Sequence, residues 1–202
     1  MAITPRQLEQ INARLSGLKP KSAPVAEAGL RAAPSGGFII IGVDPSLRGT
    51  GYGVIRFEKS NPRALAHGTI SCPATWERSR CLAKIAQTLR DVVIAYHPTV
   101  CAIEGLFYAQ NLQTALIMGE ARGAALAVLG EAGVDIYEIA PRKVKQAIVG
   151  YGAAQKSAVS KMVQRMLQLA EPPSPDAADA LAIALAHAQA GSRSLAALDK
   201  KI

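Results

Sequence analysis

Hydrophobic residues in the first half of the chain's main domain fall into short runs that are typical of strands. Residues 38–43 and 100–103 are almost continuously apolar and rich in β-branched side chains, as in strands buried on both faces. A glycine-rich turn at 45–51 leads from the first run into a second strand at 52–56, and a third strand follows at 65–71. This pattern predicts an antiparallel meander over residues 38–71.

Longer stretches have the composition and spacing of helices. They cover residues 76–96, 111–132, 157–169 and 175–190, and a short basic helix is expected to begin at Pro141. A further strand is predicted at 135–139. The order of elements, β-β-β-α-β-α-β-α-α, predicts an α/β fold with a five-stranded mixed sheet whose first three strands form the antiparallel meander. Helices on both faces, with the first and fourth strands adjacent, make this a ribonuclease-H-like arrangement.

The chain divides into three parts. Residues 1–36 form an N-terminal extension, with a short amphipathic helix predicted at about 5–17 and a linker rich in Pro, Ala, Gly and Ser after it. Residues 37–190 carry the predicted domain, and residues 191–202 form a polar C-terminal tail. The sequence leaves three roles open for the extension: docking to a partner, covering the domain, or none.

Composition narrows the class of protein. The 202 residues are 50% hydrophobic, with Lys+Arg 23 against Asp+Glu 15, which gives a formal net charge of +8. Such an excess is typical of proteins that bind a polyanion, nucleic acid first, although a basic surface alone would give the same count. The three cysteines lack metal-binding spacing, and neither a run of about 18 apolar residues nor a signal-peptide core is present. We therefore expect a soluble cytoplasmic protein without a membrane partner.

Four acidic residues stand out against this basic background. Asp176 and Asp179 lie three residues apart in the first turn of the helix that opens at Pro175, so their carboxylates share one face. Asp44 and Glu104 each end a buried strand, where ligand sites of α/β sheets form. The helix acids could simply favour the helix dipole, and each strand-end acid could be a solvated side chain. Together they predict a divalent metal site, whose all-oxygen ligands favour Mg²⁺ or Mn²⁺ over Zn²⁺.

A set of short motifs occurs in a fixed order over residues 38–190, and the order makes it specific where each motif alone is weak. The motifs are Ile41-Gly42-Val43-Asp44-Pro45, Thr50-Gly51-Tyr52-Gly53, Ala102-Ile103-Glu104 with Phe107, Gly119-Glu120-Ala121-Arg122-Gly123, Val144-Lys145-Gln146, Gly150-Tyr151-Gly152-Ala153 with Lys156, and Asp176-Ala177-Ala178-Asp179-Ala180-Leu181-Ala182. In this order they resemble the RuvC family of Holliday-junction resolvases.

The resemblance implies a homodimeric, Mg²⁺-dependent endonuclease that nicks two opposed strands of a four-way DNA junction during recombination and repair. It implies two Mg²⁺ ions per active site, for which Mn²⁺ can substitute. Asp44 would bridge both ions, Glu104 and Asp179 would each hold one, and Asp176 would hold or orient the outer ligands. A branch-migration motor of the RuvA and RuvB type is a partner implied by the family alone.

The resemblance also assigns roles to basic and aromatic residues. Lys145 and Lys156 match positions that face the scissile phosphate, where an ammonium group stabilises the transition state, although either could be a solvated surface lysine. Phe107 matches an aromatic residue that stacks on, or wedges between, bases near the junction core; it could instead be a core residue beneath its loop. The other residues expected to contact DNA are Tyr108, Arg48, Arg142 and Lys143, the last three through phosphates.

Three departures from the family pattern leave alternatives open. Ser46 stands where glycine is usual after Asp-Pro, Gly105 stands where a larger polar residue is common, and the extension at 1–36 is unusual. A junction-binding module with an inactive site is therefore one alternative to a nuclease.

A second alternative is an actin-like or sugar-kinase ATPase, whose first strand also ends in Asp before a hairpin. The chain is too short to hold both halves of such an ATPase.

Overall fold

The computed structural model describes residues 37–58, 61–105, 111–192 and 200–202. Contacts divide the chain between Pro34 and Ser35, and the described residues belong to the second unit. The predicted N-terminal helix and linker, and most of the predicted C-terminal tail, lie outside the described residues.

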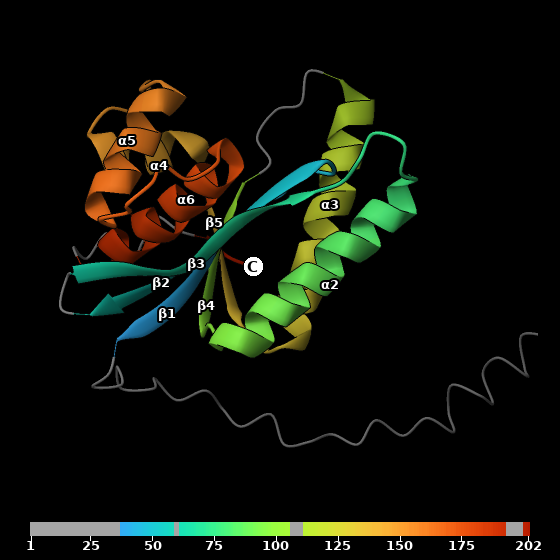
Figure 1. Cartoon of the computed structure of the whole chain (residues 1–202), viewed down its shortest axis with the longest axis horizontal. Coiled ribbons are helices and arrows are strands. Elements are labelled where there is room, and N and C mark those ends of the chain that lie inside the picture. The colour runs from blue at the N-terminus through green and yellow to red at the C-terminus, as the bar shows by residue number, and fades with distance from the viewer. Residues whose placement is uncertain (1–36, 59–60, 106–110, 193–199) are drawn as a thin grey trace, which may run out of the picture. The chain divides into compact units, whose positions relative to one another are not determined.

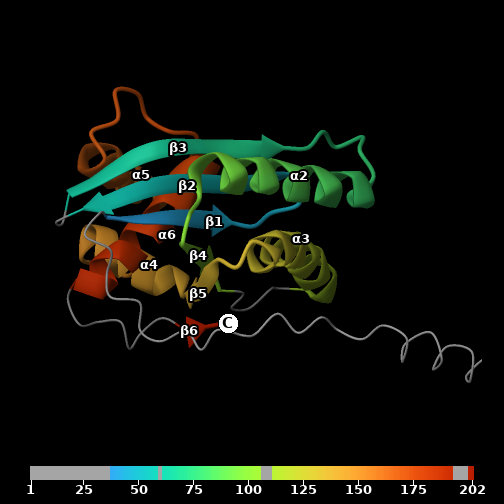
Figure 2. The ribbon, with the colours of Figure 1, turned by 90° about the horizontal axis from the view of Figure 1, so that it is seen from below.

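A mixed sheet runs through the middle of the domain (Figures 1 and 2). Strands β1 (Phe38–Asp44), β2 (Gly49–Glu58) and β3 (Asn61–Ser71) form the antiparallel meander. Strand β4 (Val100–Glu104) pairs in parallel with β1 on one side and with β5 (Asp135–Ile139) on the other. The predicted meander and the predicted contact between the first and fourth strands are confirmed, so both strand-end acids come to the same edge of the sheet.

A sixth strand, β6 (Lys200–Lys201), extends the sheet beyond β5 in the order β3-β2-β1-β4-β5-β6. It pairs antiparallel with β5, and the Nζ of Lys201 lies 2.8 Å from the Oδ1 of Asp135. The sheet therefore has one strand more than the five expected from the sequence. Two consecutive lysines carry no strand periodicity, and backbone pairing with an ion pair holds them in place.

Five helices cover the two faces of the sheet. Helices α2 (Arg78–Tyr96) and α3 (Leu112–Glu131) lie on one face, and α4 (Pro141–Val149), α5 (Lys156–Met166) and α6 (Pro175–Ser192) lie on the other (Figure 1). The pattern of each helix explains its position: in α2, for example, the buried residues recur every three or four positions. The predicted layers, with helices on both faces, are confirmed.

Alternation along β1 and β4 separates two apolar cores. Ile41 and Ile103 pack toward α2 and α3, whereas Ile40 and Ala102 pack toward α6. Since side chains change face at each residue of a strand, the next side chains of the second set are Asp44 and Glu104. Both acids therefore lie on the face that α6 covers.

Helix α6 lies directly on β1 and β2 because glycines remove the side chains that would hold it away. A Cβ built on Gly42 would lie 2.0 Å from the carbonyl oxygen of Ala180, and one on Gly51 would lie 2.0 Å from that of Asp176. Only a residue without a Cβ permits such an approach. The glycines thus bring the first turn of α6, with its two acids, to the ends of β1 and β4.

Candidate active site

The ends of β1 and β4 place two carboxyl groups side by side. The parallel register pairs Val43 with Ile103, so Asp44 and Glu104 follow at equivalent positions. The two half-buried carboxyl groups share a hydrogen bond, which Glu104 donates to Asp44. This bond requires a proton on one of the two groups.

The first turn of α6 adds the other two acids. The carbonyl oxygen of Ser174 accepts the Ala178 N–H at 2.8 Å and begins the helix. A Cβ on Gly49 would lie 3.0 Å from the Oδ2 of Asp176, so the glycine at the start of β2 leaves room for this carboxylate. Asp179, one turn further on, acts electrostatically on both strand-end acids.

Lys156, the first residue of α5, brings a positive charge into this cluster. Its Nζ donates to the Oδ2 of Asp179 at 2.6 Å, and this hydrogen bond raises the pKa of the lysine. Lys145 of α4 lines the same small pocket as Lys156, Glu104 and Asp179, with a volume of about 60 Å³. The structure therefore brings both predicted lysines to the acids.

Burial and neighbouring negative charges disfavour the ionised forms of the two strand-end acids. Burial raises the pKa of Asp44, and the charges of Asp179 and Asp176 raise it further, against the lowering effects of the Glu104 hydrogen bond and of Lys156. Burial, and then the charge of Asp44, raises the pKa of Glu104 to about 7. A bound cation would relieve this repulsion, because it favours the charged form of every carboxylate around it.

The donor set fits a hard divalent cation. Four carboxyl groups supply only oxygen ligands, which Mg²⁺ and Mn²⁺ prefer. Among the described residues as they are placed, no three acidic, histidine or cysteine side chains form a closed ligand set. Lys156 adds positive charge to this set through its ion pair with Asp179.

Comparison with known proteins identifies the family. The family model described as crossover junction endodeoxyribonuclease RuvC matches residues 40–187. The RuvC of Akkermansia muciniphila is 44% identical over 148 residues, which cover 73% of this chain and 89% of that protein. This chain belongs to the RuvC family.

Other relatives agree with this assignment. The RuvC of Coxiella burnetii is 46% identical over 150 residues, covering 74% of this chain and 87% of that protein. The structure of Thermus thermophilus RuvC in complex with a Holliday junction substrate matches with a TM-score of 0.74 and 32% identity. The match covers 82% of this chain and 99% of that one. The resemblance to RuvC and the ribonuclease-H-like fold predicted from the sequence are confirmed.

The structure describes three of the five residues of this RuvC-family chain that were expected to contact DNA. Arg48 donates from Nη1 to the carbonyl oxygens of Pro73 at 2.5 Å and Trp76 at 3.0 Å, so it also holds the segment before α2 in place. Arg142 is exposed and Lys143 half-buried in the first turn of α4. Phe107 and Tyr108 lie outside the described residues. For all five, contact with DNA stays a prediction.

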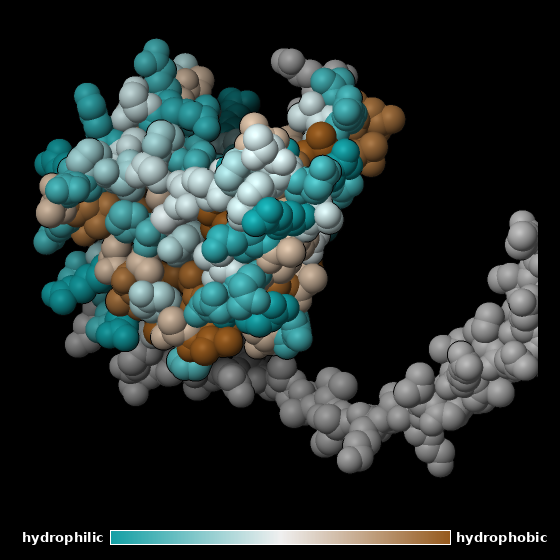
Figure 3. Space-filling view, turned by 45° about the vertical axis from the view of Figure 1, so that its right-hand side comes forward, coloured by the Kyte–Doolittle hydropathy of each residue, from teal (hydrophilic) through white to brown (hydrophobic). Residues whose placement is uncertain are grey.

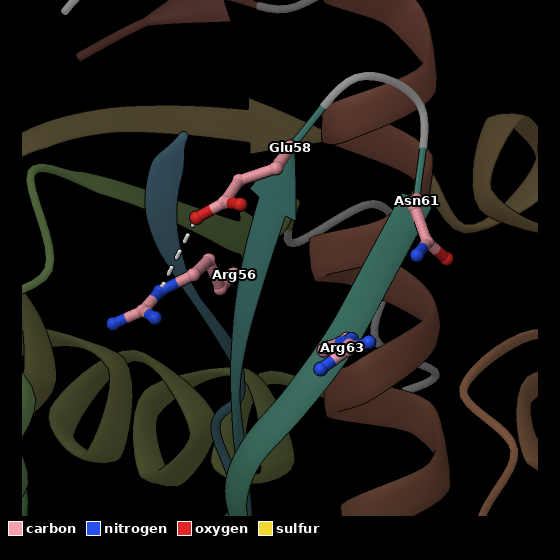
Figure 4. A pocket seen from close by; sticks show the side chains of 4 residues that line it. All are labelled: Arg56, Glu58, Asn61 and Arg63. Atoms are coloured by element: carbon pink, nitrogen blue, oxygen red, sulfur yellow. Dashed lines mark ion pairs between the residues drawn. The ribbon is translucent and has the colours of Figure 1, made fainter. Parts of the chain in front are cut away.

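A hollow larger than the pocket at the acids lies elsewhere in the described domain. It has a volume of about 340 Å³ and is lined by Arg56, Glu58, Asn61 and Arg63 at the hairpin between β2 and β3 (Figure 4). Its lining includes one ion pair, in which the Nε of Arg56 lies 3.8 Å from the Oε1 of Glu58. The β1–β2 register places this hairpin beside Phe38, at the opposite end of β1 from Asp44. The hollow is thus separate from the RuvC site.

Sequence reasoning missed two buried polar residues that support the site. The hydroxyl of Thr50 donates to the carbonyl oxygen of Ser46 at 2.5 Å and accepts the Ser46 N–H at 3.2 Å, which closes the turn after Asp44. Ser46 has a negative φ, so this turn does not require the glycine usual in the family. The other residue, Arg122, bonds the backbone of Glu104. Its place inside the motif at 119–123 was the available signal.

Proposed function

We propose that Asp44, Glu104, Asp176 and Asp179 form the catalytic centre of a crossover junction endodeoxyribonuclease that resolves four-way DNA junctions. The observation that carries the proposal is the convergence of these four acids, from two strand ends and one helix start, beside Lys156. Membership of the RuvC family supports a metal-dependent nuclease acting in recombination and repair. It decides against the actin-like ATPase.

The metal is Mg²⁺ in this proposal, with two ions per site and Mn²⁺ as a substitute. When bound, two such ions activate water and stabilise the leaving oxygen of an in-line displacement at phosphorus. Asp44, whose carboxyl group interacts with the other three acids, would be the ligand shared by both ions. Glu104 and Asp179 would each hold one ion, and Asp176, beside Gly49, would hold or orient the outer ligands.

The two lysines act on the phosphate. Lys156 is exposed except where it bonds Asp179, so its ammonium group can turn to a scissile phosphate. Lys145, from the facing helix, lies at the same pocket. Their positive charge stabilises the extra negative charge that develops on the phosphoryl oxygens. Arg48, Arg142 and Lys143 contact the DNA backbone, and Phe107 with Tyr108 contacts bases.

Cleavage of a synthetic four-way junction tests this function. The parent protein in Mg²⁺ should nick two opposed strands symmetrically, whereas EDTA or Asp44→Asn should abolish the cuts and a linear duplex should stay intact. Arg56→Gln, at the far hairpin, is the matched control and should cut like the parent. Tight binding of the junction by a parent protein that never cuts would instead establish the junction-binding module.

A homodimer is the second part of the proposal, and one face of α3 supports it. Leu112 and Leu116 are 76% and 58% exposed, and no atom lies within 4 Å of a Cβ built on Gly119 or Gly123. These four residues share one side of the helix, opposite the buried Ala125. Figure 3 shows apolar atoms at the projecting end of this helix.

A second copy is the occupant that we assign to this face. By length and composition α3 could cross a membrane. It carries Glu120, however, which bonds Arg78 of α2, and the buried Arg122. Small residues flanked by leucines let two identical helices pack closely about a two-fold axis, and paired cuts on a two-fold junction favour a two-fold enzyme.

Light scattering tests the dimer. Gly123→Glu places a charge on the face without disturbing the folded monomer, since nothing lies within 4 Å of its Cβ. It should shift the mass from dimer to monomer at micromolar concentration. Gln113→Glu, an exposed position about 100° around the helix, should leave the dimer intact. A monomeric parent, or a dimeric Gly123→Glu protein, would contradict this part of the proposal.

The proposal includes a location and a partner. The enzyme acts on junction DNA in the bacterial cytoplasm. A branch-migration motor of the RuvA and RuvB type is proposed as the partner that presents the junction. In this proposal, residues 1–36 are an extension outside the nuclease domain at 37–190, and 191–202 are a polar tail, of which Lys200–Lys201 pair with the sheet as β6.

A further inference from the structure

Arg122 is a buried charged residue of α3 that bonds the backbone of Glu104, one of the proposed catalytic acids. Its side chain is 9% exposed, and in the described part of the chain it is the only charged residue that is buried. Its Nη1 donates to the carbonyl oxygen of Glu104, and its Nη2 donates to the Oε2 of Glu138 at 2.5 Å.

The two contacts join the strand ends from the face opposite to the acids. Arg122 comes from α3, and strand alternation places Glu138, two residues after the buried Ile136, on the α3 face. The carboxyl group of Glu104 points the other way, toward Lys156 and Asp179. The guanidinium thus holds the backbone of Glu104 while leaving its side chain free to bind.

Arg122 contacts β4 at the residue where the strand ends. Glu104 is the last residue of β4, and the N–H of Gly105 makes the final bond to the carbonyl oxygen of Ile139. The planar fork of Arg122 reaches two acceptors at a fixed separation, which a flexible lysine cannot do. The fork therefore fixes the peptide plane that follows Glu104, and with it the direction of the Glu104 side chain.

We propose that Arg122, oriented by Glu138, is a positioning residue for Glu104 in metal binding. A buried ion pair is costly, and apolar residues of similar volume are often at least as stabilising, so geometry is a better explanation for it than stability. The proposal rests on the proposed function only in taking Glu104 as a metal ligand. Partners that orient metal ligands typically change metal affinity or activity about 10–100-fold when they are replaced.

The test compares Arg122→Lys and Glu138→Gln with Arg90→Gln. Lysine keeps the charge but loses one of the two contacts, and glutamine keeps the shape but loses the charge. Arg90 forms an exposed ion pair with Glu131 between α2 and α3, without contact to Glu104 or Glu138, and serves as the control. The first readout is the Mn²⁺ concentration that half-maximally raises the Tm of the DNA-free protein. We expect an increase of about 10-fold for both test variants and none for Arg90→Gln.

A double-mutant cycle separates positioning from general weakening of the fold. In the Glu104→Gln background, Arg122→Lys should cause no further change in the Mn²⁺ midpoint, because its effect passes through Glu104. At saturating Mn²⁺, kcat for junction cleavage should fall about 10-fold, while the Kd for junction in Ca²⁺ stays within about twofold of the parent.

Two results would overturn the proposal. One is a parental Mn²⁺ midpoint in Arg122→Lys and Glu138→Gln. The other is the same additional change from Arg122→Lys whether or not Glu104 is present. The nuclease function can fail separately. If the two variants show the expected increase in the Mn²⁺ midpoint but the parent protein does not cut junctions, the nuclease function is refuted and the positioning role stands.

Discussion

Replacing Glu104 by glutamine should stabilise the metal-free protein at high pH. Glu104 and Asp44 are neighbouring half-buried carboxyl groups, and this environment raises the pKa of Glu104 to about 7 from its usual 4.5. Between these pH values the folded protein binds more protons than the unfolded chain. The free energy of unfolding therefore falls as the pH rises from about 4.5 to about 7, and the whole cost persists above that range.

The gain in stability on replacing Glu104 follows from the difference between its folded and unfolded pKa values. A change of pKa from 4.5 to about 7 corresponds to at most about 3.4 kcal/mol. Water reaches part of this site and screens the charges, which reduces the cost to about 1–2 kcal/mol. Glutamine keeps the shape and can still donate to Asp44. For a domain of this size the gain should be a Tm increase of roughly 3–6 °C at pH 8 in EDTA, and close to none at pH 4.5.

Thermal unfolding followed by circular dichroism, at pH 4.5 and pH 8 in EDTA, measures this gain. Glu131→Gln is the matched control, because it replaces an exposed carboxylate on α3 by the same amide. Adding Mg²⁺ should then stabilise the parent more than the Glu104→Gln variant, which has lost a ligand. An equal Tm difference at both pH values, or a less stable Glu104→Gln protein at pH 8, would refute the electrostatic account of this site.

Three further predictions concern other parts of the site. Gly42→Ala places a methyl group against the α6 backbone and should destabilise the domain by at least about 3 kcal/mol in chemical denaturation, whereas Gly130→Ala, with open space around it, should stabilise it by about 0.5–1 kcal/mol. Equal effects would contradict the close packing of α6. Lys156→Gln should slow junction cleavage about 10²–10³-fold at unchanged junction affinity; a loss of affinity alone would make it a binding residue. Thr50→Val should cost about 1–3 kcal/mol, since it leaves the Ser46 backbone unsatisfied, and unchanged stability would contradict that role.

The layers of the fold could be predicted because the sequence carries them as periodicity. The runs ending at Asp44 and Glu104 have the composition of strands buried on both faces, and the structure confirms both strands. The acids of α6 could be connected to them because helix starts and strand ends meet at one edge of an α/β sheet. That α6 packs onto glycines of β1 and β2 was not predicted, since a glycine in a strand does not reveal what approaches it.

Other features depend on contacts between parts of the chain that are distant in sequence. Strand β6 is two lysines long and depends on pairing with β5, to which no pattern in the tail points. An arginine in a helix is usually exposed to solvent, so the sequence does not reveal that Arg122 is buried against Glu104. The Glu104–Asp44 hydrogen bond likewise depends on a register that the sequence does not specify. Such long-range contacts decide the electrostatics of the site.

The most direct test of the central claim is the single-turnover rate of junction cleavage in Mg²⁺ for carboxamide variants of the four acids, singly and combined. If the acids form one catalytic centre, Asp44→Asn and Asp179→Asn should each remove nearly all of the activity. The double variant should then lose little more than either single one, because residues that act as a unit are strongly non-additive. A single variant that cuts at the parental rate, or losses that multiply in the double variant, would contradict the claim.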